Sequence, residues 1–267
     1  MATADDTTTT ATTTTVSLDL RSENRLRVLE CADHVRRHLT SVPLDDDVSF
    51  LSDETYLRYA RARDGDPEKA LLMLEATIAW RRTYQPHRID RASVAAHLEK
   101  PTMWQMGRDR QGNALIIARP GSTNPFPPAE RVKFLVFSME QATRSATDKM
   151  TWVIDWSLWG QRKNDPDSAE TRKLTIQILQ DHYPERLAAL YMVDQPWFMT
   201  AFYYMSAPFV NSKTRAKVHI SYTREKLLEV IDREQLVDFL GGLLVSGAEP
   251  SPSSSSGDVV DPAVATP

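Results

Sequence analysis

Residues 182–197 read HYPERLAALYMVDQPW, and residues 207–220 read APFVNSKTRAKVHI. Each block contains a short apolar run, LYMVD at 190–194 and AKVHI at 216–220, of the kind that forms a buried strand. The segment between these runs, residues 196–210, is long enough for a helix. A strand, a helix and a second strand in this order predict a right-handed crossover between two parallel strands.

The same alternation continues towards the N-terminus. ALIIA at 114–118 and TWVID at 151–155 are typical of buried strands. Pro127 and Pro128 introduce one helix, while Asp165 and Pro166 cap another that runs to about His182. Strands that alternate with long helices predict an α/β domain with a mainly parallel sheet.

Residues 22–84 are predicted to be helical. One helix is expected over residues 54–63, and Asp66 before Pro67 provides the N-cap and first residue of the next. Gly65 separates the two helices, which predicts a helical hairpin in the first third of the chain. We therefore expect a helical lobe over 20–86 and an α/β lobe over 87–245, with disordered tails at 1–19 and 246–267.

Charge and composition exclude several classes of protein. The net charge of −4 comes from the two tails, which carry five acids and no base; residues 17–245 hold 32 basic and 31 acidic residues. This balance lacks the basic excess of a nucleic-acid binder. The single Cys31 suits a reducing compartment, and no secretory signal is visible. An organelle transit peptide is disfavoured because acids occur in the threonine-rich leader and arginine is absent before Arg21.

Motifs for catalysis, nucleotides and metals are missing from the sequence. There is no G-x-G-x-x-G loop and no G-x-S-x-G nucleophile turn, and the Gly107 to Gly112 spacing lacks the lysine of a phosphate loop. His34 and His38 have helical ligand spacing but are expected on a solvated face. We expect no enzyme activity, no metal and no cofactor.

The apolar segment at 197–210 leaves two alternatives open. It is too short to span a bilayer. It is apolar on nearly all sides, whereas a helix that covers one sheet face needs a single apolar stripe. Either the helix is fully buried, or it faces an apolar cavity on one side and a membrane on the other.

Six ordered blocks resemble the CRAL-TRIO lipid-binding family, and specifically its phosphatidylinositol-transfer branch. They are YLRYARARDGDPEKALLMLEATIAWRR (56–82), GRDRQGNALIIARPG (107–121), WVIDWSLWG (152–160), QDHYPERLAALYMVDQPW (180–197), APFVNSKTRAKVHI (207–220) and LVDFLGG (236–242). The resemblance implies a sheet that floors an apolar lipid pocket, closed by a mobile gate helix. It thus favours the second alternative for residues 197–210. The expected gate and acyl-pocket residues are Trp197, Phe198, Phe202, Tyr203, Met205 and Phe209.

The resemblance also implies a headgroup site. Its residues are Arg61 and Arg63 in the RAR run, Glu185 in the YPE run, Thr214 and Lys217. Cations can hold a phosphodiester while a carboxylate accepts hydrogen bonds from inositol hydroxyls. For Glu185 the alternative is a carboxylate at a helix start, and for Lys217 an ordinary solvated lysine.

Two departures from the family pattern concern the ligand. Asp64 stands where a lysine usually follows the RAR run, and Met150 and Trp152 occupy the places of the serine and threonine that bind phosphatidylcholine. Phosphatidylinositol or a related phospholipid is the expected ligand, carried by a cytoplasmic monomer that visits membranes transiently. The alternatives are a carrier of a sterol, tocopherol-like or retinoid-like molecule, and a lipid-sensing adaptor.

Overall fold

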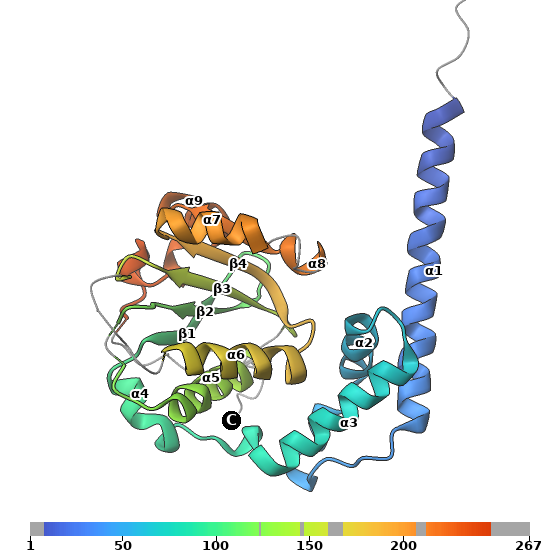
Figure 1. Ribbon diagram of the computed structural model, residues 1–267, viewed down its shortest axis with the longest axis horizontal. Coiled ribbons are helices and arrows are strands. Elements are labelled where there is room, and N and C mark those ends of the chain that lie inside the picture. Colours follow the sequence, from blue (N-terminus) through green and yellow to red (C-terminus); the bar gives the residue numbers. More distant parts are fainter. Residues whose placement is uncertain (1–7, 123, 145–146, 160–167, 207–211, 247–267) are drawn as a thin grey trace, which may run out of the picture.

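A computed structural model describes residues 8–122, 124–144, 147–159, 168–206 and 212–246 (Figure 1). Its helices are α1 (Thr8–His38), α2 (Asp53–Ala62), α3 (Pro67–Tyr84), α4 (Ala95–Glu99), α5 (Pro128–Thr143), α6 (Ser168–His182), α7 (Trp197–Ser206), α8 (Ser212–Arg215) and α9 (Arg224–Val230). Short 3₁₀ turns lie at Asp45–Phe50, Pro86–Arg88, Ala92–Val94, Arg233–Gln235 and Asp238–Leu240. The strands are β1 (Met103–Arg108), β2 (Ala114–Ala118), β3 (Met150–Asp155), β4 (Leu187–Val193) and β5 (Val218–Tyr222).

The helical lobe consists of α1, α2 and α3, as the sequence predicts. The Ser52 side chain caps α2, and the Asp66 side chain accepts a hydrogen bond from the Lys69 amide at the start of α3. The lobe's core includes Val35, Tyr59 and Leu74, all fully buried. Packing of one apolar stripe from each helix therefore holds the three helices together.

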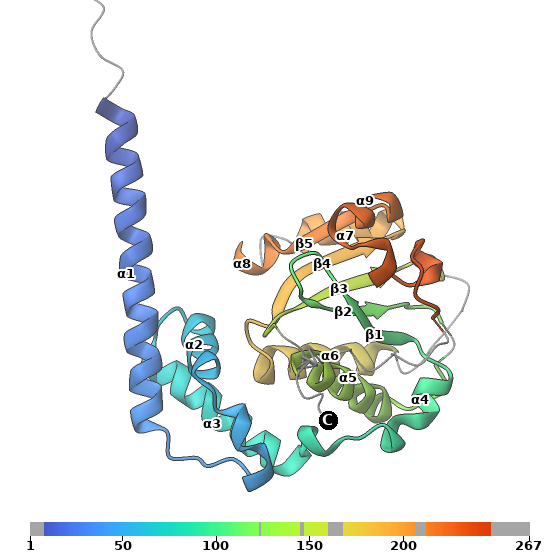
Figure 2. The same cartoon turned by 180° about the vertical axis from the view of Figure 1, so that it is seen from behind.

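The start of α1 differs from the prediction. Residues 8–19 were expected to be disordered, but α1 begins at Thr8 and extends beyond the lobe in both views (Figures 1 and 2). The C-terminal part of α1 packs through Cys31, Ala32 and Val35. The expected tail at 246–267 lies outside the described residues from 247 onwards.

The α/β lobe contains a five-stranded sheet in the order β1-β2-β3-β4-β5. Strands β2 to β5 are parallel, and β1 pairs with β2 antiparallel, which confirms the predicted mainly parallel α/β fold. The expected strand at 190–194 begins earlier, at Leu187, and ends at Val193 because Asp194 adopts a left-handed φ of 52°. The strand expected at 216–220 is shifted to Val218–Tyr222 because the Lys217 amide bonds to Thr214 O in a turn.

Two apolar layers cover the sheet. On one face Ala114, Ile116 and Met150 pack against α5, and on the other Leu115, Ile117 and Val153 pack against α9 and the C-terminal turns. The C-terminal turns approach the sheet so closely that a Cβ on Gly242 would lie 1.8 Å from the Leu236 carbonyl oxygen. The LVDFLGG block is therefore a packing motif.

A buried ion cluster joins the two lobes. The Arg81 guanidinium of α3 donates to Asp47 at 2.6 and 2.9 Å and to Glu140 of α5 at 2.9 and 3.1 Å. The Tyr183 hydroxyl also donates to Glu140, at 2.7 Å. Near this cluster, Thr77 of α3 donates to the Asp181 carbonyl at the end of α6. The segment that leads to Glu185 is thus fixed against the helical lobe.

Candidate functional site

The sheet face that carries Ile116 and Met150 is only partly covered where it continues onto β3, β4 and β5. Trp152, Leu190 and Val218 are register neighbours across the three strands, and Ile154 pairs with Met192 in the next row. All five side chains are half-buried. Residues of the opposite face, such as Val153 and Val193, are fully buried. Apolar side chains in the middle of a sheet that remain half-exposed provide a surface that an apolar ligand can cover.

Helix α7 exposes large apolar side chains. Trp197 is 81% exposed and Met205 69%, Phe198 is also exposed, and Tyr203 is half-buried. The alternative of a fully buried helix is therefore wrong. Phe209 and the Phe202 side chain lie outside what the structure describes.

The start of α7 is joined to the end of β5. The Gln195 amide donates to Thr200 of α7 at 3.2 Å and to Ser221 of β5 at 3.3 Å. Both are hydrogen bonds between neutral groups, and each contributes about 0.5–1.5 kcal/mol to stability.

The structure brings Glu185 and Lys217 together. The Lys217 ammonium lies 3.5 Å from the Glu185 carboxylate, and the two side chains are 26% and 25% exposed. Glu185 follows α6 and has a φ of 57°, so the alternative of a helix-start carboxylate is wrong. The Leu190 amide donates to the Lys217 carbonyl at 2.8 Å, which fixes Lys217 beside the strand that carries the apolar surface.

The arginines of the RAR run lie at the end of α2. Arg61 is paired with Glu54 on its own helix, and Arg63 is the exposed C-cap residue. The next residue, Asp64, pairs with Lys213 of α8 at 2.5 Å, and Thr214 is the exposed neighbour of that lysine. Figure 1 shows α8 reaching toward α2. Glu185 and Lys217 thus form one pair and Asp64 and Lys213 another, whereas Arg61 is held within its own lobe.

A further ionic group that the sequence did not single out lies next to Glu185. Arg186 donates to Asp148 at 2.5 Å, and buried Arg58 of α2 lies 3.7 Å from the same carboxylate. Burial and the nearby Arg186 lower the pKa of Arg58 to about 10, so it stays charged at neutral pH. This group ties α2 to the residues that directly precede β3 and β4. Its only sequence signal is two arginines next to predicted site residues.

The two expected pocket-modifying residues have different environments. Both lie on the same face of β3: Met150 is fully buried in the core against α5, while Trp152 packs against this core and is half-buried, next to Leu190 of β4. Of the two, Trp152 is the residue whose ring can meet a ligand on this surface.

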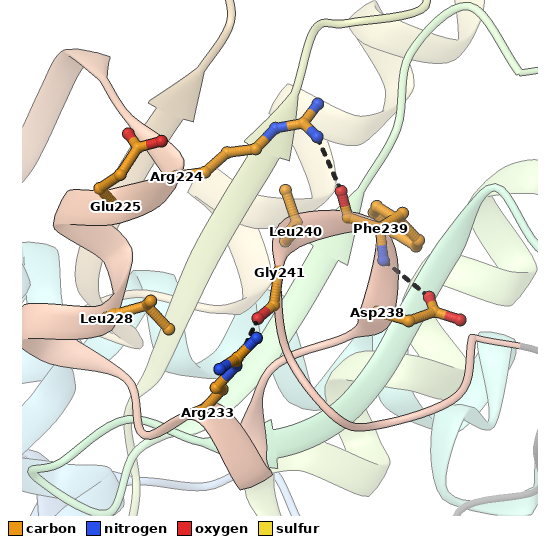
Figure 3. A pocket seen from close by; sticks show the side chains of 8 residues that line it. All are labelled: Arg224, Glu225, Leu228, Arg233, Asp238, Phe239, Leu240 and Gly241. Carbon is orange, nitrogen blue, oxygen red and sulfur yellow. Dashed lines mark hydrogen bonds between the residues drawn. The ribbon is translucent and has the colours of Figure 1, made fainter.

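A separate cavity of about 370 Å³ lies at the C-terminal turns (Figure 3). It is lined by Arg224, Glu225, Leu228, Arg233, Asp238, Phe239, Leu240 and Gly241. Its two arginines are engaged with the protein, since Arg224 donates to the Phe239 carbonyl and Arg233 to the Gly241 carbonyl. None of the sequence-predicted site residues lines it.

The described residues provide neither a metal-binding cluster nor a membrane-spanning helix. No group of three or more His, Cys, Asp or Glu side chains in that part of the chain is arranged to hold a metal ion. None of the helices described there combines the length and apolar character that crossing a bilayer requires.

The chain combines a helical lobe with a mainly parallel sheet, and the Glu185–Lys217 pair lies beside the half-buried apolar face of that sheet. The family model of the CRAL/TRIO domain matches residues 98–242, more than half of the chain, and the protein belongs to this family. The match confirms the resemblance that the sequence blocks indicated.

Individual relatives add detail. The phosphatidylinositol transfer protein PDR17 of Saccharomyces cerevisiae is 30% identical over 223 residues, which are 78% of this chain and 62% of that protein. Patellin-5 of Arabidopsis thaliana is 26% identical over 242 residues, 80% of this chain and 36% of that protein. The phosphatidylinositol/phosphatidylcholine transfer protein SFH13 of Arabidopsis thaliana is 26% identical over 212 residues, 70% of this chain and 34% of that protein. The chain therefore spans less than two thirds of the length of these relatives.

A solved structure supports the fold assignment. The crystal structure of Sfh5 matches with a TM-score of 0.52 at 20% identity, over 66% of this chain and 67% of that one. At this identity the likeness concerns the fold alone.

Proposed function

We propose that this protein binds phosphatidylinositol or a closely related phospholipid and exchanges it between its own pocket and membranes. The observation that carries the proposal is the Glu185–Lys217 pair beside the half-buried apolar face of β3, β4 and β5. A cation with a carboxylate next to an apolar surface suits a ligand with a polar phosphate headgroup and acyl chains. The similarity to PDR17 and SFH13, both phosphatidylinositol transfer proteins by name, supports the same ligand class.

The physical task of a carrier explains why α7 is proposed as the gate. Moving a lipid through water costs about 0.8 kcal/mol for each exposed CH₂ group, or on the order of 25 kcal/mol for two 16-carbon chains. The carrier must cover nearly all of this surface and still release it at the bilayer. Helix α7 carries apolar side chains for both the closed and the open state of such a gate. Trp197 and Met205 are exposed and available to a membrane, while Tyr203 is half-buried.

The remaining features of the proposal concern the whole molecule. We propose a non-enzymatic monomer without a cofactor, found in the cytoplasm and at membrane surfaces only transiently. Its working unit comprises the helical lobe over 20–86 and the lipid-binding lobe over 87–245. The described residues include no nucleophile-and-base arrangement that we can assign to catalysis.

Lipid extraction from the purified protein tests the ligand class. Mass spectrometry of the extract is expected to find phosphatidylinositol or a related phospholipid, and the protein is expected to move that lipid between donor and acceptor vesicles. An extract free of lipid, together with no transfer, would contradict the proposal.

Substitutions test the headgroup pair. Glu185→Ala and Lys217→Ala are expected to abolish phosphatidylinositol transfer and to leave the circular dichroism spectrum unchanged, because both side chains are partly exposed and neither belongs to a hydrophobic core cluster. Lys226→Ala provides the matched control, since Lys226 is an exposed lysine of α9. Transfer by the two variants at the control rate would show that this pair does not hold the headgroup.

A second candidate function is the carriage of another hydrophobe, such as a sterol, tocopherol-like or retinoid-like molecule. Trp152 on the open sheet face favours it, because an indole ring can stack on a flat ring system. The same lipid extract distinguishes the two functions, since a ring-containing hydrophobe without phosphorus would replace the phospholipid. A lipid-sensing adaptor would instead retain its lipid and show no net transfer.

A further inference from the structure

Glu185, the carboxylate of the proposed headgroup pair, has a backbone conformation that few residues adopt. Its φ of 57° lies in the left-handed region, where glycine is the usual residue because a Cβ is disfavoured. A residue with a side chain persists there only where its surroundings hold it, and such residues are concentrated at functional sites. The contacts on both sides of Glu185 therefore determine where its carboxylate lies.

Tyr183 anchors the chain two residues before Glu185. It is buried, and its hydroxyl donates to Glu140 of α5 at 2.7 Å, while its ring meets Trp80 of α3 edge-on with the ring centroids 6.0 Å apart. Burial and the charge of Glu140 raise the pKa of Tyr183 well above 10, so the hydroxyl keeps its proton and donates at neutral pH. The ring of Pro184 fixes its φ at about −65°, so little backbone freedom separates Tyr183 from Glu185.

The helical lobe fixes the acceptor of the Tyr183 hydroxyl. Glu140 accepts two hydrogen bonds from Arg81 of α3, at 2.9 and 3.1 Å, and Arg81 in turn is held by Asp47. Both carboxylates are buried, so these bonds form away from water. A line of buried contacts thus runs from the helical lobe through Arg81, Glu140 and Tyr183 to the turn that carries Glu185.

Arg186 anchors the chain directly after Glu185. Its carbonyl accepts a hydrogen bond from the Met150 amide at 2.8 Å. Its guanidinium donates to the Asp148 carbonyl at 2.8 Å and to the carboxylate of the same residue at 2.5 Å. Arg58 of α2 lies 3.7 Å from that carboxylate. Glu185 is therefore held between two anchors, each of which leads to the helical lobe.

We propose that Tyr183 is a positioning residue, which through its hydroxyl bond to Glu140 holds the Glu185 carboxylate in place to receive an inositol headgroup. This inference rests on the proposed function. Lys217 lies 3.5 Å from that carboxylate, so a displaced Glu185 would lose the lysine as well as the inositol hydroxyls. The helical lobe thus contributes to headgroup recognition through contacts that lie in the protein interior.

The test is Tyr183→Phe, which keeps the buried ring, changes no charge and removes only the hydroxyl. Transfer between vesicles is measured while the mole fraction of phosphatidylinositol in the donor vesicles is varied, which gives a half-saturating fraction and a maximal rate. Tyr183→Phe is expected to raise the half-saturating fraction by roughly two- to tenfold, the range that the loss of one hydrogen bond covers, and to leave the maximal rate unchanged. An unchanged half-saturating fraction would overturn the proposal.

Hydrogen exchange measures the position of the turn without the lipid. In Tyr183→Phe the amides of residues 184–189 are expected to exchange faster than in the unmodified protein, because one of the two anchors of this segment is lost. Exchange in α2, which belongs to the other anchor, is expected to stay the same. Unchanged exchange over 184–189 would also contradict the positioning role of Tyr183.

Two controls separate positioning from a general loss of stability. Tyr84→Phe removes the hydroxyl of a half-buried tyrosine whose ring stacks on the same Trp80 at 5.1 Å, and it should leave the half-saturating fraction unchanged. Asp47→Asn weakens the buried cluster at its contact with Arg81. It is expected to lower Tm more than Tyr183→Phe does, and yet to leave the half-saturating fraction unchanged. A rise in either control equal to that in Tyr183→Phe would overturn the proposal.

Further outcomes separate this inference from the proposed function. If the unmodified protein transfers phosphatidylinositol and Tyr183→Phe has the same half-saturating fraction, the inference alone is refuted. If the unmodified protein transfers no phosphatidylinositol, the proposed function is refuted, and the role of Tyr183 in headgroup recognition is refuted with it.

Discussion

The buried cluster around Arg81 makes the sharpest prediction about stability. In Arg81→Met, the carboxylates of Asp47 and Glu140 lose all four of the hydrogen bonds that Arg81 donates to them. Both carboxylates are buried, at 4% and 8% exposure, so water cannot replace the lost partner. Removal of one member of a buried ion pair costs about 3–5 kcal/mol. For a domain of this size that corresponds to a fall in Tm of about 6–20 °C.

The pH dependence gives a second readout of the same variant. Burial acts to raise the pKa of Glu140, but the hydrogen bonds and charge of Arg81 outweigh it and hold the pKa below 4.5. This stabilisation is present above the unfolded pKa and is lost as the pH falls through the folded pKa. In Arg81→Met burial acts without this partner and raises the pKa, so the variant regains stability on protonation. The difference in unfolding free energy between the two proteins is expected to narrow from pH 7 to pH 5.

Urea and thermal unfolding followed by circular dichroism measure both effects. Arg88→Met is the matched control because Arg88 pairs with Asp46 at the surface, and it should cost no more than about 1 kcal/mol. The triple variant Arg81→Met, Asp47→Asn, Glu140→Gln should recover part of the loss, since no buried charge remains unpaired. The reasoning would be refuted if Arg81→Met lost no more unfolding free energy than Arg88→Met. It would also be refuted if the difference in unfolding free energy between Arg81→Met and the unmodified protein stayed the same from pH 7 to pH 5.

Three further predictions concern packing, pH and membranes. Gly242→Ala should lower the free energy of unfolding, measured by urea titration, by about 3 kcal/mol or more. The control Gly241→Ala, whose added Cβ meets nothing within 4 Å, should lower it by only about 1 kcal/mol. Similar losses in the two variants would contradict the packing role of Gly242. Burial lowers the pKa of His182, so the unfolded chain takes up a proton at this residue more readily than the folded protein, and the free energy of unfolding should fall as the pH drops below 6.5. If His182→Gln and the unmodified protein show the same change in unfolding free energy from pH 7 to 5, His182 is not responsible for this pH dependence. Trp197→Ala should weaken sedimentation with phospholipid vesicles by roughly tenfold, whereas Leu72→Ala, at an exposed apolar position of α3, should not; equal binding by both would place the membrane contact elsewhere.

Local sequence was sufficient for most elements of the fold. The helix that begins at Pro67 and the strands at 114–118 and 151–155 follow from capping residues and short apolar runs, whose effects act within a few residues. Strand β1 was not predicted. Its pairing is irregular between Gln105 and Arg108, and its buried residues, Met103 and Met106, do not alternate with a period of two.

The candidate site was also predicted only in part from the sequence. The family resemblance in the sequence implied that Glu185 and Lys217 serve one headgroup site, and the composition of residues 197–210 predicted a helix that is apolar on nearly all sides. Only the tertiary structure decided that Trp197 is exposed, that Arg61 is held by its own helix, and that Asp64 meets Lys213. The physical reason is range: propensity and periodicity act between neighbours along the chain, whereas the partner of a surface charge depends on how the two lobes lie against each other.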